Sequence, residues 1–283
     1  MESQIRTVPF GKTEQGEEVT LYRIYNNAGS YIEVLDYGCT VMGMYVRQRD
    51  QRLRNVLCGC GTLKDCERVA ARAGAVEAEG NWEIPLCKQI WHARLAEDHA
   101  VIFSACAVSN DDTIDAAVKF RMKDFDRLVI DYSAKTREGK PAALTHKLRF
   151  SLDDQLTAGS HKMRVFARHE IDGAGKSVPL QSGKSSAIDY NPLQNGEHTY
   201  LSEEDIIHPF IELASDSTDL ALTAYSTMSA MEMTVCGDPW QGVSLKARGS
   251  GTRAEERTVY GVDSLYHPED KALANPFMLF MPG

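Results

Sequence analysis

Two titratable side chains lie next to each other in the run Leu-Thr-His-Lys-Leu-Arg-Phe-Ser-Leu, which spans residues 144 to 152. An imidazole or a lysine side chain can exchange a proton with a reacting atom, which is the chemistry of general acid–base catalysis. The large apolar residues of the run share the parity of His146, a period-two pattern typical of a half-buried β-strand. The run therefore predicts a strand on which His146 and Lys147 face opposite sides of a sheet.

The rest of the chain supplies the sheets that such a strand needs. Short runs rich in β-branched and aromatic residues recur about every eight to twelve residues, with turn signals between them. This spacing predicts a sandwich or barrel of antiparallel strands rather than alternating strands and helices. Only Thr62–Ala73 and Ser202–Ile207 are compatible with short helices. The other predicted strands are Val19–Tyr25, Tyr31–Asp36, Thr40–Arg47, Arg54–Cys58, Ile90–Leu95, His99–Ser109, Thr113–Lys119, Leu128–Lys135, Met163–Ala167, His208–Leu213, Asp219–Ser226, Met231–Cys236 and Gly242–Ala247.

Length and composition are those of an ordinary globular chain. All-β folds of about 200–250 residues often form one unit, so a single domain over residues 1–283 is expected. With 43% hydrophobic and 25% charged residues, the chain can bury a sizeable core. A net charge of -9 opposes binding to the phosphates of nucleic acids. Because no apolar run is long enough for a signal peptide or a membrane span, we expect a cytoplasmic protein without a membrane partner; the oligomeric state stays open.

Seven cysteines occur in the chain, and an odd number without a secretion signal favours reduced thiols. Cys58, Cys60 and Cys66 form a cluster that invites a metal-site interpretation. Structural zinc sites use ligands two to four residues apart in paired knuckles, whereas the first spacing here is one residue and no second pair follows. We therefore expect small buried side chains in or beside strands, and neither a metal nor another cofactor.

Several motifs, taken in order along the chain, are similar to those of one enzyme family. Tyr37–Met42 matches a tyrosine-glycine-alanine strand, and Glu67–Arg72 keeps both arginines of a glycine-arginine-x-x-asparagine-arginine motif. Residues 144–152 match leucine-threonine-asparagine-histidine-x-tyrosine-phenylalanine-asparagine-leucine, and Gly242–Leu245 matches the strand that carries the family's glutamate. On these residues the chain resembles the aldose 1-epimerase (galactose mutarotase) superfamily over nearly its full length. The resemblance implies an all-β fold, a large antiparallel β-sandwich of the galactose mutarotase-like supersandwich type, with a sugar cleft on one sheet.

The resemblance also implies a reaction. Mutarotation needs a base that takes the proton of the anomeric hydroxyl group and an acid that protonates the ring oxygen. In the family a glutamate and a histidine fill these roles. Their positions are occupied here by Lys246 and Lys147, and His146 stands where asparagine is usual. Lys147, Lys246 and His146 are therefore the candidate catalytic residues. His146 could supply the acid only after a one-residue slip of its strand, which would turn Phe150 to the opposite face.

Four further residues match positions in the family's sugar site. Arg72 stands at the second arginine of its motif, and a guanidinium donates several hydrogen bonds in a fixed geometry. The alternative for Arg72 is a salt bridge to a nearby carboxylate such as Glu77. Asp189 belongs to an aspartate-aromatic pair, and His208 follows the position of a family aspartate. The fourth candidate for substrate binding is Arg248, on the same predicted strand as Lys246.

Three functional hypotheses follow from these residues. The first is a carbohydrate-binding, aldose 1-epimerase-like enzyme that interconverts sugar anomers with an altered acid–base pair. The second is a catalytically silent sugar-binding protein that keeps the cleft but not the proton-transfer pair. The third is a binding site for an anionic sugar, such as a sugar phosphate or a uronate, which convergence of Arg72, Lys147, Lys246 and Arg248 on one sheet would favour.

Overall fold

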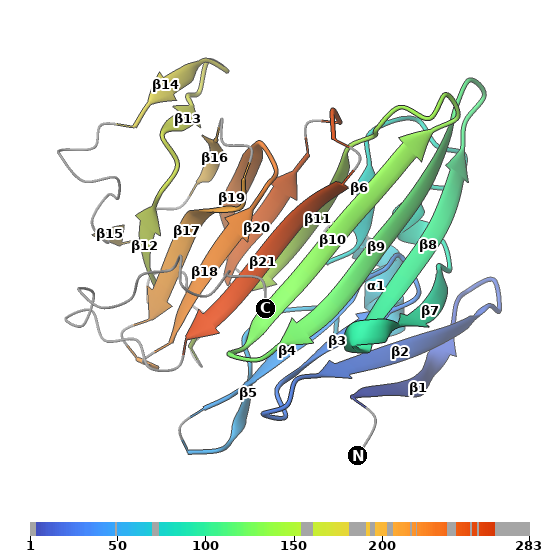
Figure 1. The fold of residues 1–283 in the computed structure, drawn as a ribbon, viewed down its shortest axis with the longest axis horizontal. Coiled ribbons are helices and arrows are strands. Elements are labelled where there is room, and N and C mark those ends of the chain that lie inside the picture. The colour runs from blue at the N-terminus through green and yellow to red at the C-terminus, as the bar shows by residue number, and fades with distance from the viewer. Residues whose placement is uncertain are drawn as a thin grey trace.

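The computed structural model describes residues 4–48, 50–69, 74–153, 161–180, 191–192, 196–202, 206–215, 217–218, 220–236, 242–249, 251–253 and 255–263. In these residues the chain forms three antiparallel β-sheets. In the view of Figure 1 a nine-stranded sheet lies across the front, a seven-stranded sheet lies behind it and a five-stranded sheet lies below. The prediction of an all-β antiparallel sandwich is therefore confirmed.

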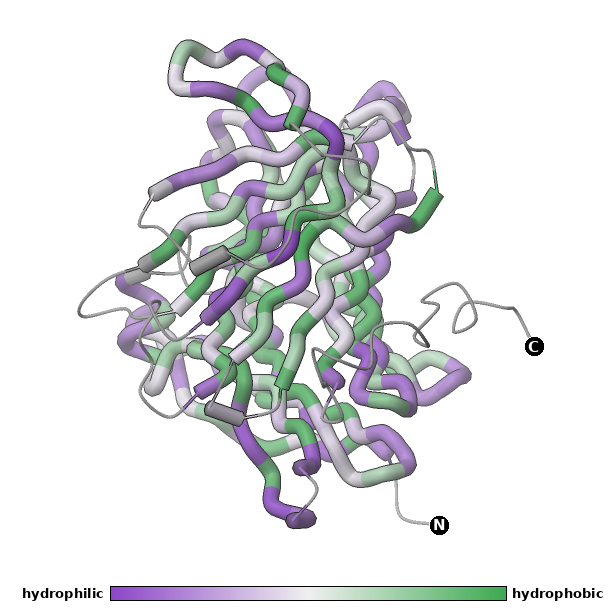
Figure 2. The backbone as a smooth tube through the Cα atoms, turned by 90° about the vertical axis from the view of Figure 1, so that its left-hand side faces the viewer, coloured by the Kyte–Doolittle hydropathy of each residue, from purple (hydrophilic) through white to green (hydrophobic). Residues whose placement is uncertain are grey.

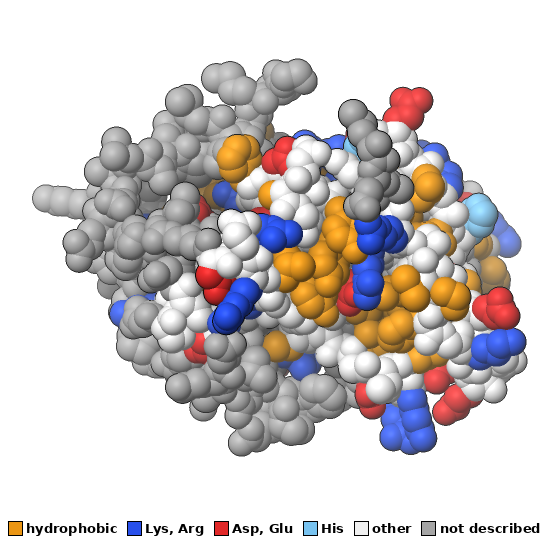
Figure 3. Space-filling view, turned by 90° about the horizontal axis from the view of Figure 1, so that it is seen from below, with side chains coloured by type: hydrophobic (Ala, Val, Ile, Leu, Met, Phe, Trp, Pro, Cys, Tyr) orange, Lys and Arg blue, Asp and Glu red, His pale blue; other side chains and the backbone are white. Residues whose placement is uncertain are grey.

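The five-stranded sheet is a meander in which each strand pairs with the next one in the chain. Its outer face carries a row of three tyrosines, because Tyr25 lies opposite Tyr31 and Tyr31 lies opposite Tyr45. The ring centroids of Tyr31 and Tyr45 are 4.5 Å apart. Seen from below, apolar side chains gather in patches beside lysine and arginine side chains (Figure 3). The strands are β1 (Ile5–Lys12), β2 (Glu18–Tyr25), β3 (Tyr31–Leu35), β4 (Val41–Arg47) and β5 (Leu53–Asn55).

Two larger sheets form the sandwich, and their strands come from distant parts of the sequence. The nine-stranded sheet has the order β15 (Asn191–Pro192), β12 (His161–Val165), β17 (His208–Ser215), β18 (Ala221–Ser226), β21 (Glu255–Asp263), β10 (Arg127–Thr136), β9 (Thr113–Lys123), β8 (Ala100–Val108) and β7 (His92–Ala96). The seven-stranded sheet has the order β14 (Ser177–Pro179), β13 (His169–Ile171), β16 (Glu197–Leu201), β19 (Ala230–Cys236), β20 (Gly242–Arg248), β11 (Leu144–Phe150) and β6 (Val76–Ala78). Along many of these strands hydrophobic and hydrophilic residues alternate (Figure 2).

Helices are few and short among the described residues. The α-helix α1 covers Leu63–Val69, so it occupies the first part of the stretch predicted as compatible with helix. Thr62 stabilises its start, since the Thr62 hydroxyl oxygen accepts a hydrogen bond from the backbone N–H of Asp65 at 3.2 Å. Two 3₁₀ turns, η2 (Leu86–Lys88) and η3 (Glu97–His99), complete the set. The predicted helix at Ser202–Ile207 lies partly outside the described residues, since 203–205 are not described.

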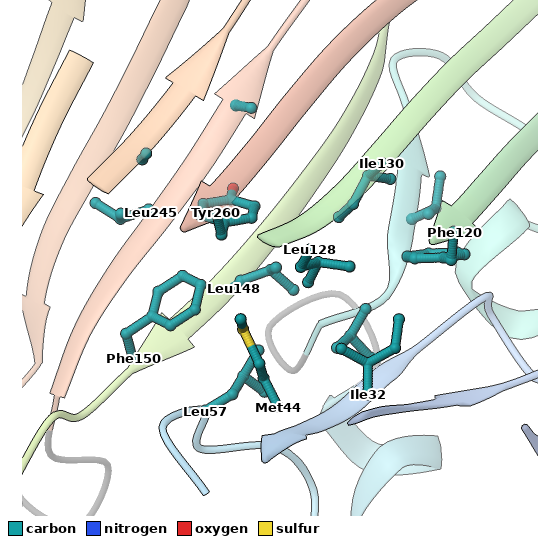
Figure 4. Close-up of a cluster of buried hydrophobic side chains, with 14 of the residues drawn as sticks. Ile32, Met44, Leu57, Phe120, Leu128, Ile130, Leu148, Phe150, Leu245 and Tyr260 are labelled. Atoms are coloured by element: carbon teal, nitrogen blue, oxygen red, sulfur yellow. The ribbon is translucent and has the colours of Figure 1, made fainter. Parts of the chain in front are cut away.

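The core lies between the sheets, and β11 contributes to it through alternate residues. His146, Leu148 and Phe150 are fully buried, whereas Lys147 is only partly buried. Figure 4 shows Leu148 and Phe150 pointing toward side chains of the nine-stranded sheet and of the N-terminal strands. The predicted register of this strand is therefore confirmed. The labelled residues of this cluster are Ile32, Met44, Leu57, Phe120, Leu128, Ile130, Leu148, Phe150, Leu245 and Tyr260.

Truncating the centre of this core should lower stability strongly. The Phe150 ring is fully buried, and its centroid lies 5.0 Å from that of Tyr260. We expect Phe150→Ala to reduce the free energy of unfolding by about 3–5 kcal/mol, because it loses apolar burial and leaves a cavity. Urea denaturation followed by tryptophan fluorescence measures this change. The matched control Phe125→Ala, at a ring that is 74% exposed, should change it by less than about 0.5 kcal/mol.

Candidate functional site

The two lysines at the predicted catalytic positions lie directly opposite each other. In the pairing of β11 with β20, Lys147 is the register partner of Lys246. Directly opposed residues of an antiparallel pair share a face, so both ammonium groups lie on the outer face of the seven-stranded sheet. Two like charges in this arrangement repel each other. The site must therefore supply compensating negative charge.

Glu232 supplies part of that charge. It lies on β19 opposite Lys246, and its carboxylate is 3.2 Å from the Lys246 ammonium group. The side chains of Lys246 and Glu232 are 26% and 29% exposed, so solvent only partly screens the pair. Lys147, Lys246 and Glu232 thus form one row across three neighbouring strands.

A second row lies beside the first. Thr145 is the register partner of Arg248 on one side and of Glu77 on the other. The Arg248 guanidinium donates a hydrogen bond to Glu79 at 2.5 Å and lies 3.5 Å from Glu232. The structure therefore brings Lys147, Lys246 and Arg248, three of the four cations that the third hypothesis named, onto one face, but each row also contains a carboxylate.

Glu77 is a site residue that the sequence analysis considered only as a salt-bridge partner. It lies on the three-residue strand β6, and its side chain is partly buried beside the lysine pair. Burial raises the pKa of the Glu77 carboxyl group, while the charges of Lys246 and Lys147 oppose this increase. A strand of three residues has no detectable periodicity, so no sequence signal placed Glu77 on this face.

His146 lies on the other face of β11 and does not reach the charged rows. Its ring is fully buried, its Nε2 is 2.5 Å from the carbonyl oxygen of Gly74, and its Nδ1 is 3.2 Å from the Tyr132 hydroxyl group. Since a carbonyl oxygen only accepts, Nε2 carries the proton and Nδ1 accepts from Tyr132. Burial lowers the pKa of His146 to about 4. His146 could act as the catalytic acid only after a slip of its strand, and the strand has not slipped. As a correction to that candidate role, His146 is a neutral hydrogen-bonding group of the core.

Of the other candidate residues, the structure describes only His208. His208 begins β17 in the nine-stranded sheet, where its Nδ1 donates to the carbonyl oxygen of Ile206 at 2.9 Å and its ring packs 4.4 Å from that of Phe210. His208 thus lies on a different sheet from Lys147 and Lys246, and its role in substrate binding stays a prediction. Arg72 and Asp189 lie outside the described residues, so their roles in substrate binding stay predictions.

The described part of the chain contains neither a cluster suited to a metal ion nor a helix suited to a membrane span. No group of three or more histidine, cysteine, aspartate or glutamate side chains there is arranged to hold a metal ion. Likewise, none of the helices described above has both the length and the apolar character needed to cross a bilayer.

Solved structures share this fold. Sandwiches of this arrangement are galactose mutarotase-like, and the solved structures that match include the aldose epimerase homologue of C. elegans, with a TM-score of 0.71 and 13% sequence identity over 87% of this chain and 99% of that one. The galactose 1-epimerase of Lactobacillus acidophilus matches with a TM-score of 0.69 and 12% identity, over 93% of this chain and 99% of that one.

A sequence relative agrees with the fold. The aldose 1-epimerase of Escherichia coli is 23% identical over 316 aligned residues, which cover 90% of each chain. No family model matches the sequence. The resemblance to the aldose 1-epimerase superfamily is confirmed.

The buried histidine should make stability depend on pH. The pKa of His146 is near 4 in the folded protein and about 6.5 when unfolded, so the unfolded chain binds the extra proton and stability falls as the pH drops from 7 toward 4. From pH 7 to pH 5 we expect this group to cost about 2 kcal/mol of unfolding free energy. His146→Gln should remove this contribution, as denaturation curves at both pH values would show. An equal pH dependence in wild type and variant would contradict the prediction.

Proposed function

We propose that the chain binds an aldose on the outer face of the seven-stranded sheet and interconverts its anomers with a carboxyl–lysine pair. The observation that carries this proposal is the position of Glu77, a partly buried carboxyl group beside Lys147 and Lys246. Similarity to aldose 1-epimerase along 90% of the chain supports a sugar as ligand. The family's glutamate and histidine are absent from their positions, so other groups must transfer the protons.

Glu77 and Lys147 together meet the needs of the reaction. The Glu77 carboxylate can accept the proton of the anomeric hydroxyl group, and its raised pKa brings it closer to neutral pH than an ordinary glutamate. The Lys147 ammonium group can donate a proton or a hydrogen bond to the ring oxygen. Lys246, which is ion-paired to Glu232, holds a second positive charge directly opposite Lys147. An acid and a base are thus available without histidine.

The charge distribution favours a neutral sugar over an anionic one. Lys246 and Arg248 both face Glu232, and Arg248 also binds Glu79. A phosphate or uronate on this face would have to displace carboxylates or lie beside them, and like charges at short range repel. The described cations therefore share one face with carboxylates and do not form a surface of uncompensated positive charge.

The proposal predicts measurable mutarotation. Freshly dissolved α-D-glucose or α-D-galactose should approach anomeric equilibrium faster with the protein than in buffer, as followed by NMR or polarimetry. We expect Glu77→Gln and Lys147→Met each to lower the catalysed rate by about 10²-fold or more, as is typical when a general acid or base is removed. The controls Glu138→Gln and Lys12→Met, at exposed ion pairs away from these rows, should leave the rate unchanged.

The pH dependence of this rate provides an independent test. Because Glu77 must be ionised to act as a base, the rate should fall as the pH drops through its pKa, which burial holds above 4.5. The fall should therefore begin at a higher pH than for an ordinary glutamate. If the residual rate of Glu77→Gln fell with decreasing pH over the same range as the wild-type rate, the fall would belong to a different group. That result would contradict the role of Glu77 as the base.

A second candidate function is sugar binding without catalysis. The ion pair of Lys246 with Glu232 favours this function. Lys246 stands at the position of the family's catalytic base, so that position holds a paired cation and not a base. Saturation-transfer NMR distinguishes the two functions. Binding of α-D-galactose with no acceleration of mutarotation identifies a silent binder, whereas binding with acceleration lost in Glu77→Gln identifies the enzyme.

A further inference from the structure

Three sulfur atoms meet beneath α1, away from the charged rows. The Sγ of Cys66 lies 3.5 Å from the Sδ of Met42, and the thiols of Cys66 and Cys60 are hydrogen-bonded to each other. Cys60 precedes the helix, whereas Cys66 lies inside it. The loop and the helix of one short segment therefore bring two thiols into contact.

The surroundings of this pair are apolar. Both thiols belong to a cluster on the outer side of the five-stranded sheet that also contains Leu21, Met42 and Leu63. Cys60 is 5% exposed and Cys66 is fully buried. A large reagent therefore cannot reach the pair without opening the helix, whereas a small one such as a peroxide needs only a slight opening at Cys60.

We infer that Cys60 and Cys66 form an oxidisable dithiol, which a small peroxide converts into an intramolecular disulfide. The inference rests on the contact between the thiols and their place at the start of a short helix, and it does not depend on the proposed sugar chemistry. A disulfide between these residues would tie the segment before α1 to the helix itself. Since Arg72 follows α1 by three residues in the sequence, the modification would act on the segment that leads to a predicted sugar-binding residue.

The electrostatics of the pair assign the two sulfur atoms different roles. The hydrogen bond from Cys66 lowers the pKa of the Cys60 thiol, and the nearby Arg149 guanidinium acts in the same direction. The same hydrogen bond, together with burial, raises the pKa of Cys66. Cys60 is also the more exposed of the two thiols, at 5% against 0% for Cys66, so Cys60 meets the oxidant as the nucleophile and Cys66 is the thiol that resolves the product.

The chemical steps balance with hydrogen peroxide as the oxidant. The Cys60 thiolate attacks one peroxide oxygen, the O–O bond breaks, and Cys60 becomes a sulfenic acid while the departing hydroxide is protonated to water. The Cys66 thiol then attacks the sulfenic sulfur, an S–S bond forms, and a second water leaves with the Cys66 proton. Two electrons pass from the two thiols to one peroxide.

The other cysteines provide internal controls. Cys106 is exposed, but its pKa is raised by partial burial and by Asp115. Cys39 is fully buried, and burial raises its pKa well above the ordinary value. If exposure alone decided reactivity, Cys106 would be oxidised first. If thiolate character and a neighbouring thiol decide, the pair at Cys60 reacts first.

The test is mass spectrometry of the full chain. The reduced protein is treated with one equivalent of hydrogen peroxide, alkylated with N-ethylmaleimide, digested without reductant and mapped. The expected result is loss of two of the seven thiols, with a peptide linked through Cys60 and Cys66 that dithiothreitol separates. In Cys66→Ala, dimedone should trap Cys60 as a sulfenic acid. The control Cys39→Ala should form the same link as wild type.

Two results would overturn the inference. One is recovery of Cys60 and Cys66 as alkylated thiols while Cys106 is oxidised. The other is a disulfide that joins Cys60 to a different cysteine, such as Cys58. Because the decisive experiment uses the wild-type chain, failure of a variant to fold does not affect it. Absence of mutarotase activity would not affect it either.

Discussion

The register of β11 is the constraint on which the rest of the structure depends. His146, Leu148 and Phe150 are buried between the sheets, so the intervening residues must face outward. A shift of one residue would bury Lys147 and expose Phe150, which would lose apolar burial and place an ammonium group in the core. The hydrophobic effect on one face of the strand thus fixes the position of the charges on the other. It also fixes their partners, because β20 and β6 pair with β11 in a single register.

His146 connects the core to the neighbouring loop. Its protonated nitrogen donates to the carbonyl oxygen of Gly74, and the same oxygen accepts a hydrogen bond from the backbone N–H of Val41. An unpaired imidazole in this position would be costly, so the core holds the chain just before β6 in place. Glu77 follows three residues later, beside the lysine pair. A histidine that takes no part in proton transfer therefore helps to position the carboxyl group that we propose does.

Much of the fold could be predicted from the sequence, because burial on one face of a strand leaves a period of two in the residue types. The strand at 144–152, its register and the meander of the first strands follow from that signal. The site could be predicted only in part. Pairing of Arg248 with Glu79 joins residues 169 positions apart, and nothing in local residue types encodes it. Glu77 lies on a strand too short for any period, and His208 lies on a different sheet from Lys147 and Lys246.

Replacement of a catalytic glutamate and histidine by two lysines does not by itself abolish acid–base chemistry. Two opposed ammonium groups repel each other, and this repulsion must be offset by carboxylates drawn from the neighbouring strands. Glu232 offsets it from one side and Glu77 from the other. Charge compensation therefore places a carboxyl group next to an ammonium group. A base and an acid thus lie side by side on one face of the sheet. Fold similarity identifies the sandwich, but the chemistry that we propose for the site follows from this local balance of charge.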